Sequence, residues 1–279
     1  MPDCSGFDLH CHSTRSDGVL APGVVVARAA ARGVHTLALT DHEETGGLDE
    51  ARAAAQAVGL TLVNGVEISV SWNGRTLHVV GLRIDAAHPL LAQGLRRLRS
   101  GRHERAVRIA AGLEAAGIPG SLTGARSFVT NPELVGRAHF ARYLLEQGRG
   151  RDLQAVFRNY LTEGRPGYVP HQWAELGEAV HWICASGGIA VLAHPGRYAM
   201  TSAAREALLG AFVDAGGAGI EVMIGSHSAQ QCATWANYAR RYGLLASSGS
   251  DFHGPDGGAR DFGRLPGLPP GLRPVWERF

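Results

Sequence analysis

Four short apolar segments of this chain each run directly into histidine or aspartate, and this repeat limits the folds that the chain can adopt. Their polar ends are Asp8-Leu9-His10-Cys11-His12, Asp41-His42, His194-Pro195 and Gly249-Ser250-Asp251-Phe252-His253. Alternate side chains of an extended backbone point the same way, so His10 and His12 share one face while Cys11 points into the core. Buried strands that each end in a potential metal ligand indicate one site built where the strands end.

The rest of the chain alternates between apolar strands and helices, which favours parallel α/β winding. Further strands are expected at residues 34–40, 60–66, 189–193, 218–222 and 244–248. Helices are expected between Pro22 and Gly33 and at residues 46–58, 174–186, 202–215 and 228–242. The dipeptide Asn73-Gly74, between residues 69–72 and 75–80, predicts a hairpin that returns His78 to the sheet. Together these elements predict an α/β barrel of about seven strands, with the ligands at their carboxyl ends.

Residues 89–168 interrupt this alternation. A long arginine-rich helix is expected at residues 89–116, with further helices at 133–147 and 152–162 and no strand between them. So long a stretch without a strand favours a separate subdomain over ordinary outer-layer helices. We therefore expect a barrel of residues 1–88 and 169–279 and a helical insertion of residues 89–168, here called the cap. The tail from residue 254 is expected to wrap the surface as irregular chain.

Composition excludes several classes of protein. The 279 residues carry 27 basic and 25 acidic side chains, so no generally basic surface indicates binding to long duplex nucleic acid. No apolar run reaches the roughly 18 residues of a membrane span, and residues 1–12 lack the basic start and apolar core of a signal peptide. The four cysteines show neither metal-site nor disulfide spacing: Cys4, Cys11, Cys184 and Cys232. We expect a cytoplasmic protein with reduced thiols and no membrane partner.

Nine potential ligands are expected to meet at the carboxyl ends of the strands. They are six histidines and three carboxylates: His10, His12, Asp17, His42, Glu67, His78, His194, Asp251 and His253. Nine nitrogen and oxygen ligands exceed the need of one first-row metal ion, whereas three ions that share Glu67 as a bridge would use them all. Imidazole and carboxylate without thiolate suit Mn, Fe or Zn. We expect three divalent ions, with Mn as the first choice.

These motifs resemble those of the PHP family, the polymerase and histidinol phosphatase domains. The matching segments span nearly the whole chain: Asp8-Leu9-His10-Cys11-His12, Thr40-Asp41-His42, Gly65-Val66-Glu67, Ala193-His194-Pro195 and Gly249-Ser250-Asp251-Phe252-His253. The resemblance implies a distorted (β/α)7 barrel with a trinuclear metal site. It implies one ion on His10, His12, Glu67 and Asp251, a second on Glu67, His78 and His194, and a third on Asp17, His42 and His253.

Within the family the chain is most similar to 3′,5′-nucleotide bisphosphate phosphatases, whose relatives include a 5′-to-3′ exoribonuclease that acts on short RNA. The features are the cap and four segments: Gly136-Arg137-Ala138-His139-Phe140-Ala141-Arg142, Gly164-Arg165-Pro166-Gly167-Tyr168-Val169-Pro170, His194-Pro195-Gly196-Arg197-Tyr198 and Gly225-Ser226-His227-Ser228. Ala138 departs from the pattern, because relatives often carry Thr or Pro there. This departure puts one substrate hydrogen bond in question and leaves the metal ligands untouched.

The expected reaction is metal-assisted hydrolysis of a phosphate ester. Bound cations lower the pKa of water from 15.7 toward about 7 and offset charge on the transferring phosphoryl group. The resemblance implies a nucleoside 3′,5′-bisphosphate such as adenosine 3′,5′-bisphosphate (pAp) as substrate, giving AMP and phosphate. Catalytic roles are expected for Glu67, Arg197 and His227. Substrate contacts are expected from Arg197, His227, Arg137, His139, Arg102 and Tyr168, those in the cap gripping the 5′-phosphate and base.

Several alternatives stay open at this point. The nearest is 5′-to-3′ cleavage of short 5′-phosphorylated RNA, since the near-neutral charge argues against long duplexes and not against oligonucleotides. Histidinol-phosphate hydrolysis would leave the cap without a use. A non-catalytic metal- or nucleotide-binding module would be expected to lack ligands, whereas all nine positions are filled. Glu221 either supports a ligand or pairs with an arginine, and the sequence decides neither this nor the oligomeric state.

Overall fold

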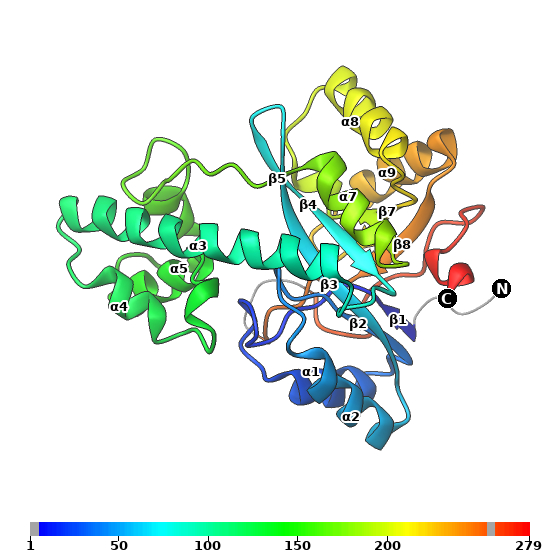
Figure 1. Ribbon diagram of the computed structural model, residues 1–279, viewed down its shortest axis with the longest axis horizontal. Helices are drawn as coiled ribbons and strands as arrows, with labels where there is room; N and C mark the ends of the chain where they lie inside the picture. Colours follow the sequence, from blue (N-terminus) through cyan, green and yellow to red (C-terminus); the bar gives the residue numbers. More distant parts are fainter. Residues whose placement is uncertain (1–5, 256–259) are drawn as a thin grey trace.

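A barrel-like sheet, helices around it and a helical cap on one side make up this protein (Figure 1). The computed structural model describes residues 6–255 and 260–279. The strands lie side by side in the order β1 (Phe7–Asp8), β2 (Thr36–Leu39), β3 (Thr61–Trp72), β4 (Arg75–Leu82), β6 (Ile189–Leu192), β7 (Gly219–Ile224) and β8 (Leu245–Gly249). The amide of Leu9 donates to the carbonyl of Ser248 at 2.9 Å, which links the first strand to the last. The prediction of a distorted seven-stranded barrel is confirmed.

Glycine permits this near-closure. A Cβ on Gly249 would lie 2.5 Å from the Cβ of His10, so only glycine lets β8 approach β1 here. The amide of Asp251 then donates to the carbonyl of His10 at 2.9 Å. The contact brings two of the motifs identified in the sequence, from opposite ends of the chain, to the same edge of the sheet.

β4 is the one strand of the barrel that runs against its neighbours. It pairs antiparallel with both β3 and β6, whereas the other neighbouring pairs of the barrel are parallel. The predicted hairpin is confirmed, with Asn73 and Gly74 at φ angles of 45° and 71°. The expected break between residues 66 and 69 is wrong, because β3 continues through it as one strand. Since β4 is reversed, its amino-terminal half, with His78, lies at the edge where the parallel strands end.

Five helices pack around the barrel: α1 (Pro22–Ala31), α2 (Leu48–Val58), α7 (Leu176–Ala185), α8 (Ser202–Asp214) and α9 (Ala229–Tyr242). All five were expected, and left-handed Gly59 and Gly243 end α2 and α9. The helix expected from residue 174 starts two residues later, because β5 (Ala174–Glu175) pairs with β3 instead. Inside the barrel, apolar side chains of β2, β3, β4, β6 and β8 form one buried cluster with Leu9 and Val275. Val275 belongs to the 3₁₀ turn η5 (Val275–Arg278), so the tail is not wholly irregular.

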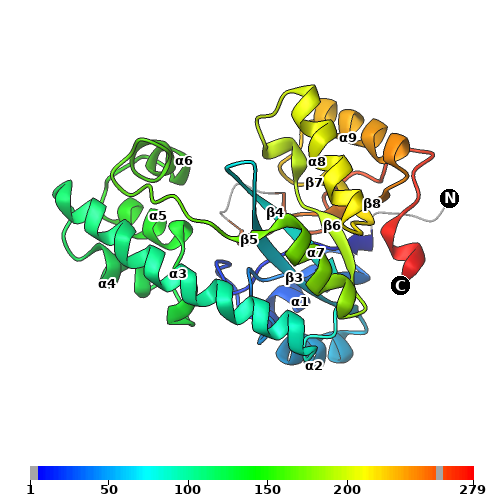
Figure 2. The ribbon, with the colours of Figure 1, turned by 45° about the horizontal axis from the view of Figure 1, so that its top comes forward.

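All the regular secondary structure of the cap is helical (Figure 2). Its elements are α3 (Pro89–Ala115), α4 (Ser121–Arg126), η2 (Pro132–Leu134), α5 (Arg137–Glu146), α6 (Leu153–Val156) and η3 (Phe157–Leu161). α4 was not expected. The expected helix 133–147 begins only at Arg137, because Gly136 is extended, and the expected helix 152–162 divides into α6 and a π-helical turn.

α3 belongs to two hydrophobic clusters. Near its start, Leu91 and Leu95 are buried in the cluster that contains the barrel strands and α7. Near its end, Leu113 is buried with Phe140 and Leu144 of α5. A Cβ on position 94 would lie 2.5 Å from the ring of Trp182, so a glycine there brings α3 close to α7. One continuous helix therefore connects the barrel and the cap.

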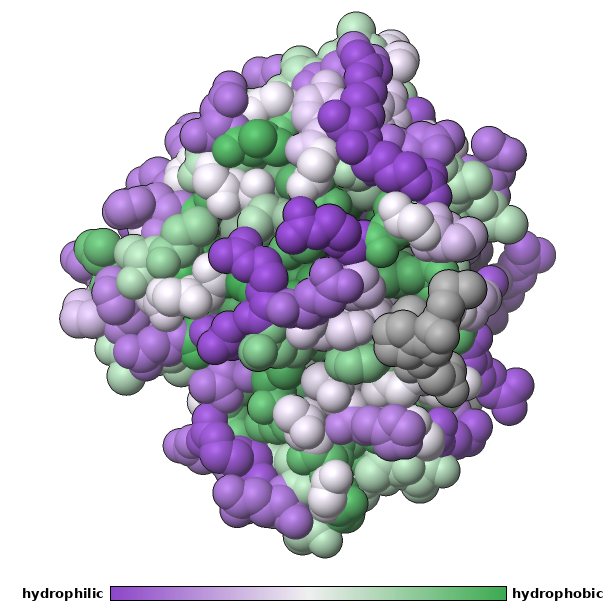
Figure 3. All heavy atoms as spheres, turned by 90° about the vertical axis from the view of Figure 1, so that its right-hand side faces the viewer, coloured by the Kyte–Doolittle hydropathy of each residue, from purple (hydrophilic) through white to green (hydrophobic). Residues whose placement is uncertain are grey.

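Three further features concern the face opposite the cap, the lengths of the helices and the cysteines. On the face away from the cap, hydrophilic and hydrophobic side chains are interspersed (Figure 3). No helix within the described ranges is both long and apolar enough to cross a membrane. Cys11, Cys184 and Cys232 carry free thiols, and Cys4 lies outside the described residues.

Candidate metal and phosphate site

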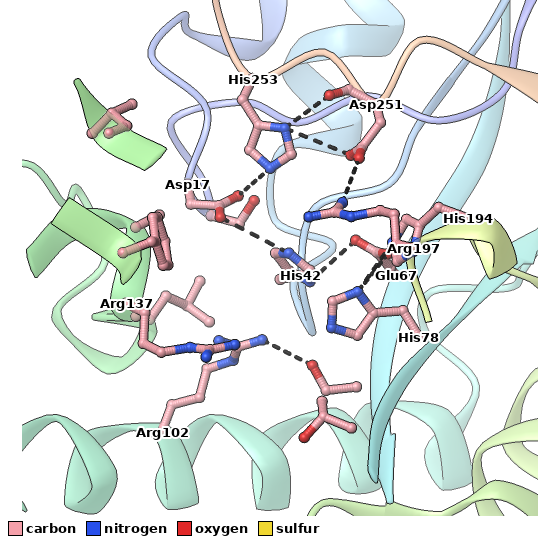
Figure 4. A pocket seen from close by; sticks show the side chains of 18 of the residues that line it. Asp17, His42, Glu67, His78, Arg102, Arg137, His194, Arg197, Asp251 and His253 are labelled. Atoms are coloured by element: carbon pink, nitrogen blue, oxygen red, sulfur yellow. Dashed lines mark hydrogen bonds and ion pairs between the residues drawn. The ribbon is translucent and has the colours of Figure 1, made fainter. Parts of the chain in front are cut away.

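The nine predicted ligands lie together at the mouth of the barrel, and Figure 4 shows those that line the pocket: Asp17, His42, Glu67, His78, His194, Asp251 and His253. Loops after β1, β2 and β8 provide most of them, β3 and β4 carry Glu67 and His78, and β6 leads into His194. Their ligand atoms form four overlapping groups, each with all atoms within 4.8 Å of one another: His12, Asp17, His42 and His253; His10, Glu67 and His194; His10, His12 and Asp251; and His42, Glu67 and His78. We call these nine residues the ligand wall.

Glu67 lies at the centre of the ligand wall. Its Oε1 is 2.9 Å from Nδ1 of His78 and 2.8 Å from Nε2 of His194. Its Oε2 is 3.3 Å from Nε2 of His10 and of His12 and 3.2 Å from Nδ1 of His42. Burial alone would raise the pKa of Glu67, but these imidazoles outweigh it and hold the pKa well below its ordinary value. One carboxylate therefore faces five imidazoles, the arrangement expected of a bridge.

The ligand wall fits divalent cations. Nε2 of His10 and Nε2 of His12 lie 3.1 Å apart, so two ring nitrogens converge on one point. Asp17 Oδ1 and His42 Nδ1 are buried and make no hydrogen bond of regular geometry in the described structure, although each has an oppositely charged or polar ligand atom 3.2 Å away, on His253 and Glu67 respectively. Buried polar atoms without a regular hydrogen bond are costly unless something else binds them. A thiol-free set of imidazoles and carboxylates suits Mn, Fe or Zn.

Buried side chains behind the ligand wall hold it in place. Glu221 accepts from Nδ1 of His10 at 2.7 Å and from the amide of His194 at 2.5 Å, which answers the question that the sequence left open. Asp41 accepts from Ser13 and Ser16 and so shapes the loop after β1. Carboxylates that hold the far nitrogen of a ligating histidine fix its ring orientation.

Two ligands sit on unusual backbone. His194 and Asp251 have φ angles of 27° and 56°, where residues other than glycine are rare. His194 lies two residues after the end of β6, and Asp251 lies two residues after the end of β8. Local strain of this kind is typical of functional sites.

The ligand wall faces a second set of side chains across a pocket of about 590 Å³. We call this second set the arginine wall, and it comprises Arg102, Arg105, Arg137, Phe157 and Trp173. The guanidinium of Arg102 lies over the Trp173 ring at 4.7 Å, and that of Arg105 at 5.6 Å. Positive charge and aromatic surface therefore share one side of the pocket.

The three arginines differ in what they bind. Arg102 pairs with the buried carboxylate of Glu43 and donates to Ser69 Oγ at 3.1 Å. Arg105 and Arg137, by contrast, have no carboxylate within ion-pair distance among the described residues. Burial, then the neighbouring Arg137 and Arg102, lowers the pKa of Arg105 to about 9. Burial is also the main cause that lowers the pKa of Arg137. These two cations are uncompensated, which indicates that a bound anion compensates them.

Two histidines expected to touch substrate do not line this pocket. His227 is buried, its Nδ1 donates to the carbonyl of Val222 at 3.2 Å, and its Nε2 accepts from the amide of Gly196 at 2.9 Å. His139 is fully buried, accepts from the amide of Gly136 at 3.0 Å and donates to the carbonyl of Ser16 at 3.2 Å. Both rings use both nitrogens on backbone, and burial lowers the pKa of each, to about 4 for His139.

The other predicted contacts divide between two hollows. Arg137, Arg102 and Arg197 line the pocket, and Nη1 of Arg197 donates to Oδ2 of Asp251 at 2.9 Å. Tyr168 instead lines an adjoining hollow. Phe157, Arg158 and Trp173 also line the pocket and were not expected there. Trp173, which follows the cap in the sequence, could have been a signal for a residue that stacks on substrate. Nothing in the sequence showed the direction of its side chain.

Comparison with known proteins places these features in a family. The family model described as PHP domain matches residues 8–223. The chain is 55% identical over 275 residues to a 3′,5′-nucleoside bisphosphate phosphatase of Chromobacterium violaceum, covering 99% of this chain and 96% of that protein. It is 43% identical over 273 residues to a 5′-3′ exoribonuclease of Haemophilus influenzae, covering 98% of each. The solved structure of a C. violaceum amidohydrolase with bound sulfate and no metal superposes with a TM-score of 0.95 at 54% identity, covering 98% of this chain and 95% of that one.

Proposed function

This chain belongs to the PHP domain family, and we propose that it is a metal-dependent phosphoesterase that hydrolyses the 3′-phosphate of nucleoside 3′,5′-bisphosphates such as pAp. The similarity to a bisphosphate phosphatase over almost the whole chain supports this substrate. The observation that carries the proposal is the pocket itself, in which a cluster of metal ligands faces two uncompensated arginines. A substrate with two phosphates would satisfy both walls at once.

In this proposal the ligand wall holds three divalent cations, Mn in the first place, with Fe or Zn as alternatives. The ligand groups would be His10, His12, Glu67 and Asp251; Glu67, His78 and His194; and Asp17, His42 and His253. Bound cations of this kind supply a water of lowered pKa and neutralise charge on the phosphoryl group. Because Glu67 contacts ligands of all three groups, its loss would disturb every one of them.

The protein's own side chains would orient the substrate. Nη1 of Arg197 donates to Asp251, and the side chain is half-exposed. The other N–H groups of the guanidinium would bind the scissile phosphate. Arg105 and Arg137 would bind the 5′-phosphate, and Phe157 and Trp173 offer faces for the base. His227 would position the loop with Gly196 and Arg197, since its ring is committed to backbone on both sides. His139 would likewise fix the start of α5 against the loop that carries Asp17.

Residues 89–168 would then act as a substrate cap. Six of its side chains reach the loops after β1 and β2: Arg99, Arg102, Thr130, Asn131, His139 and Arg142. Anchored in this way, the cap would hold the nucleotide end of the substrate while the ligand wall acts on its 3′-phosphate. Histidinol phosphate has no nucleobase for the cap to hold. A module without activity would not need all nine ligand positions to be filled.

The experiment that tests this proposal is phosphate release from pAp by metal-stripped protein, before and after addition of Mn²⁺. We expect no release without metal and restored release with it, together with a metal content above one ion per chain. A small aryl phosphate serves as a control that engages the ligand wall alone, and we expect a much lower kcat/KM for it. If the reloaded protein releases no phosphate from pAp, the proposed function is wrong.

A further inference from the structure

Glu43 directly follows the ligand His42 and is not part of the ligand wall, yet its side chain is fully buried. Its φ angle is 48°, in a region where residues other than glycine are rare. A buried charge on strained backbone persists only where the surrounding structure holds and compensates it. The partners of this carboxylate lie on segments of both the barrel and the cap.

In the barrel, Glu43 joins the loop after β2 to β3. Its amide donates to the carbonyl of Glu67 at 2.9 Å, and its Oε1 accepts from the amide of Ser69 at 2.7 Å. The amide of Glu67 donates in turn to the carbonyl of Asp41 at 3.3 Å. These bonds flank His42 on one segment and Glu67 on the other. Glu43 therefore holds two ligand-bearing segments together at the centre of the ligand wall.

In the cap, the partner of Glu43 is Arg102 of α3. Nε and Nη2 of Arg102 both contact Oε2 of Glu43. Cζ of the same guanidinium lies 4.7 Å from the centroid of the Trp173 ring, and a Cβ on Gly136 would lie 3.4 Å from its Nη1. Gly136 directly precedes Arg137 at the start of α5. One buried ion pair therefore fixes an arginine that packs against both an aromatic face and the start of α5.

Most other hydrogen bonds from the cap to these loops end on backbone carbonyls. Such bonds are donated by Arg99, Thr130, His139 and Arg142. A backbone carbonyl is present whatever side chain its residue carries. A buried carboxylate and guanidinium depend on each other, because removal of one leaves the other charged and unpaired. The side chain of Glu43 is therefore a point at which the barrel sets the position of the arginine wall.

We propose that Glu43 is a positioning residue that sets the distance between the two walls, and so the spacing of the two phosphates that this protein accepts. Glu43 does not line the pocket in the described structure, so it acts through Arg102. A displaced Arg102 would shift Trp173 and the start of α5 and would leave the ligand wall with its metal ions. This inference rests on the proposed function, because it concerns a substrate held at both walls.

Glu43→Gln tests this role in the Mn²⁺-loaded protein, because the amide keeps the size of the side chain and an acceptor for Ser69 while removing the charge that Arg102 pairs with. The readouts are the Kd of AMP by calorimetry, KM and kcat for pAp and for a small aryl phosphate, and the metal content. We expect Kd for AMP and KM for pAp to rise about 10–100-fold, the range of a lost charge-assisted contact. The loss of kcat/KM should be at least about tenfold smaller for the aryl phosphate, with wild-type metal content.

Glu44→Gln is the matched control. Glu44 lies on the same loop and accepts from Asn131 of the cap at 3.1 Å, but it makes no hydrogen bond or ion pair with Arg102 in the described structure. It should change each value by less than about threefold. A second variant, Glu43→Gln with Arg102→Met, removes both charges and so avoids an unpaired buried arginine. It keeps the role testable if Glu43→Gln fails to fold, and we expect the same selective loss on pAp.

The outcomes separate this inference from the proposed function. Proportional losses on pAp and the aryl phosphate, an unchanged Kd for AMP in Glu43→Gln, or wild-type values in the double variant would each refute the positioning role and leave the phosphatase standing. An equal effect of Glu44→Gln would also refute it, because any loosening of the cap would then suffice. If the wild-type protein hydrolyses no pAp, the proposed function itself fails.

Discussion

The ligand wall and the arginine wall face each other across one pocket, and their charges are held in opposite ways. On the ligand wall, carboxylates and imidazoles balance one another, and Glu221 fixes two of the histidine positions from behind. On the arginine wall, Arg105 and Arg137 line the same pocket with no carboxylate within ion-pair distance in the described structure, and burial, then the charge of Arg137, lowers the pKa of Arg105. The ligand wall is thus built to gather cations, whereas the arginine wall is incomplete until an anion arrives. The difference indicates that the substrate supplies the missing charge.

Replacing Glu67, the bridge in the proposed metal site, should produce the largest effect on either wall. Glu67→Gln keeps the size of the side chain and removes the charge that five imidazoles face. We expect activity on pAp to fall by about 10³-fold or more, with loss of bound metal. Glu221→Gln is the matched control, because it touches the histidines only from behind and should cost about 10–100-fold. Equal losses in the two variants, with metal retained, would mean that Glu67 is not a bridge.

Truncating the arginine wall should have a smaller and more selective effect. Arg105→Ala and Arg137→Ala are each expected to raise KM for pAp by about 10–100-fold, the range of a charge-assisted contact, and to leave hydrolysis of a small aryl phosphate nearly unchanged. Arg108→Ala, an exposed neighbour on the same helix that lines neither hollow, is the control and should be silent. A parallel loss on both substrates would show that the arginine wall acts on structure and not on recognition.

The smallest expected effect concerns His139, which links the start of α5 to the loop that carries Asp17. It should appear in the free energy of unfolding. Burial lowers the pKa of His139 to about 4. As pH falls below about 6.5, His139 is therefore protonated in the unfolded chain but stays neutral in the folded chain. Stability is therefore present above pH 6.5 and is lost as pH falls toward 4, by up to roughly 3 kcal/mol from this residue. Urea unfolding at pH 7.5, 6 and 5 should show a shallower decline in His139→Gln than in the wild type. Parallel declines would contradict this assignment.

The two walls also differ in how far the sequence predicts them. Most ligands of the ligand wall lie in strands or shortly after them, and the alternation of strand and helix brings the ends of parallel strands to one edge, so the strand pattern places most of them. His78 needed the hairpin as well, which Asn73-Gly74 indicates. The arginine wall comes from helices and from the irregular segment after them, where the direction of a side chain depends on packing that spacing does not reveal.

His139 and His227 show the limit of such inference most clearly. Both lie in segments that resemble the family pattern, and both were expected to meet substrate. Yet each ring is buried with a backbone partner on either nitrogen. A motif therefore identifies where histidine is needed, and only the surrounding fold shows whether the ring serves the substrate or the loop that carries another residue.

The continuity of α3 has a consequence for how this enzyme can be altered. Its 27 residues extend about 40 Å without interruption, and leucines near its two ends are buried in different hydrophobic clusters. Barrel and cap are therefore not modules joined at a loop. Exchange of the cap between relatives at residue 89 would replace side chains that pack against α7, whereas a junction within the helix, between Leu98 and Ala106, would keep both sets of contacts. The position at which this helix is cut decides whether a chimaera folds.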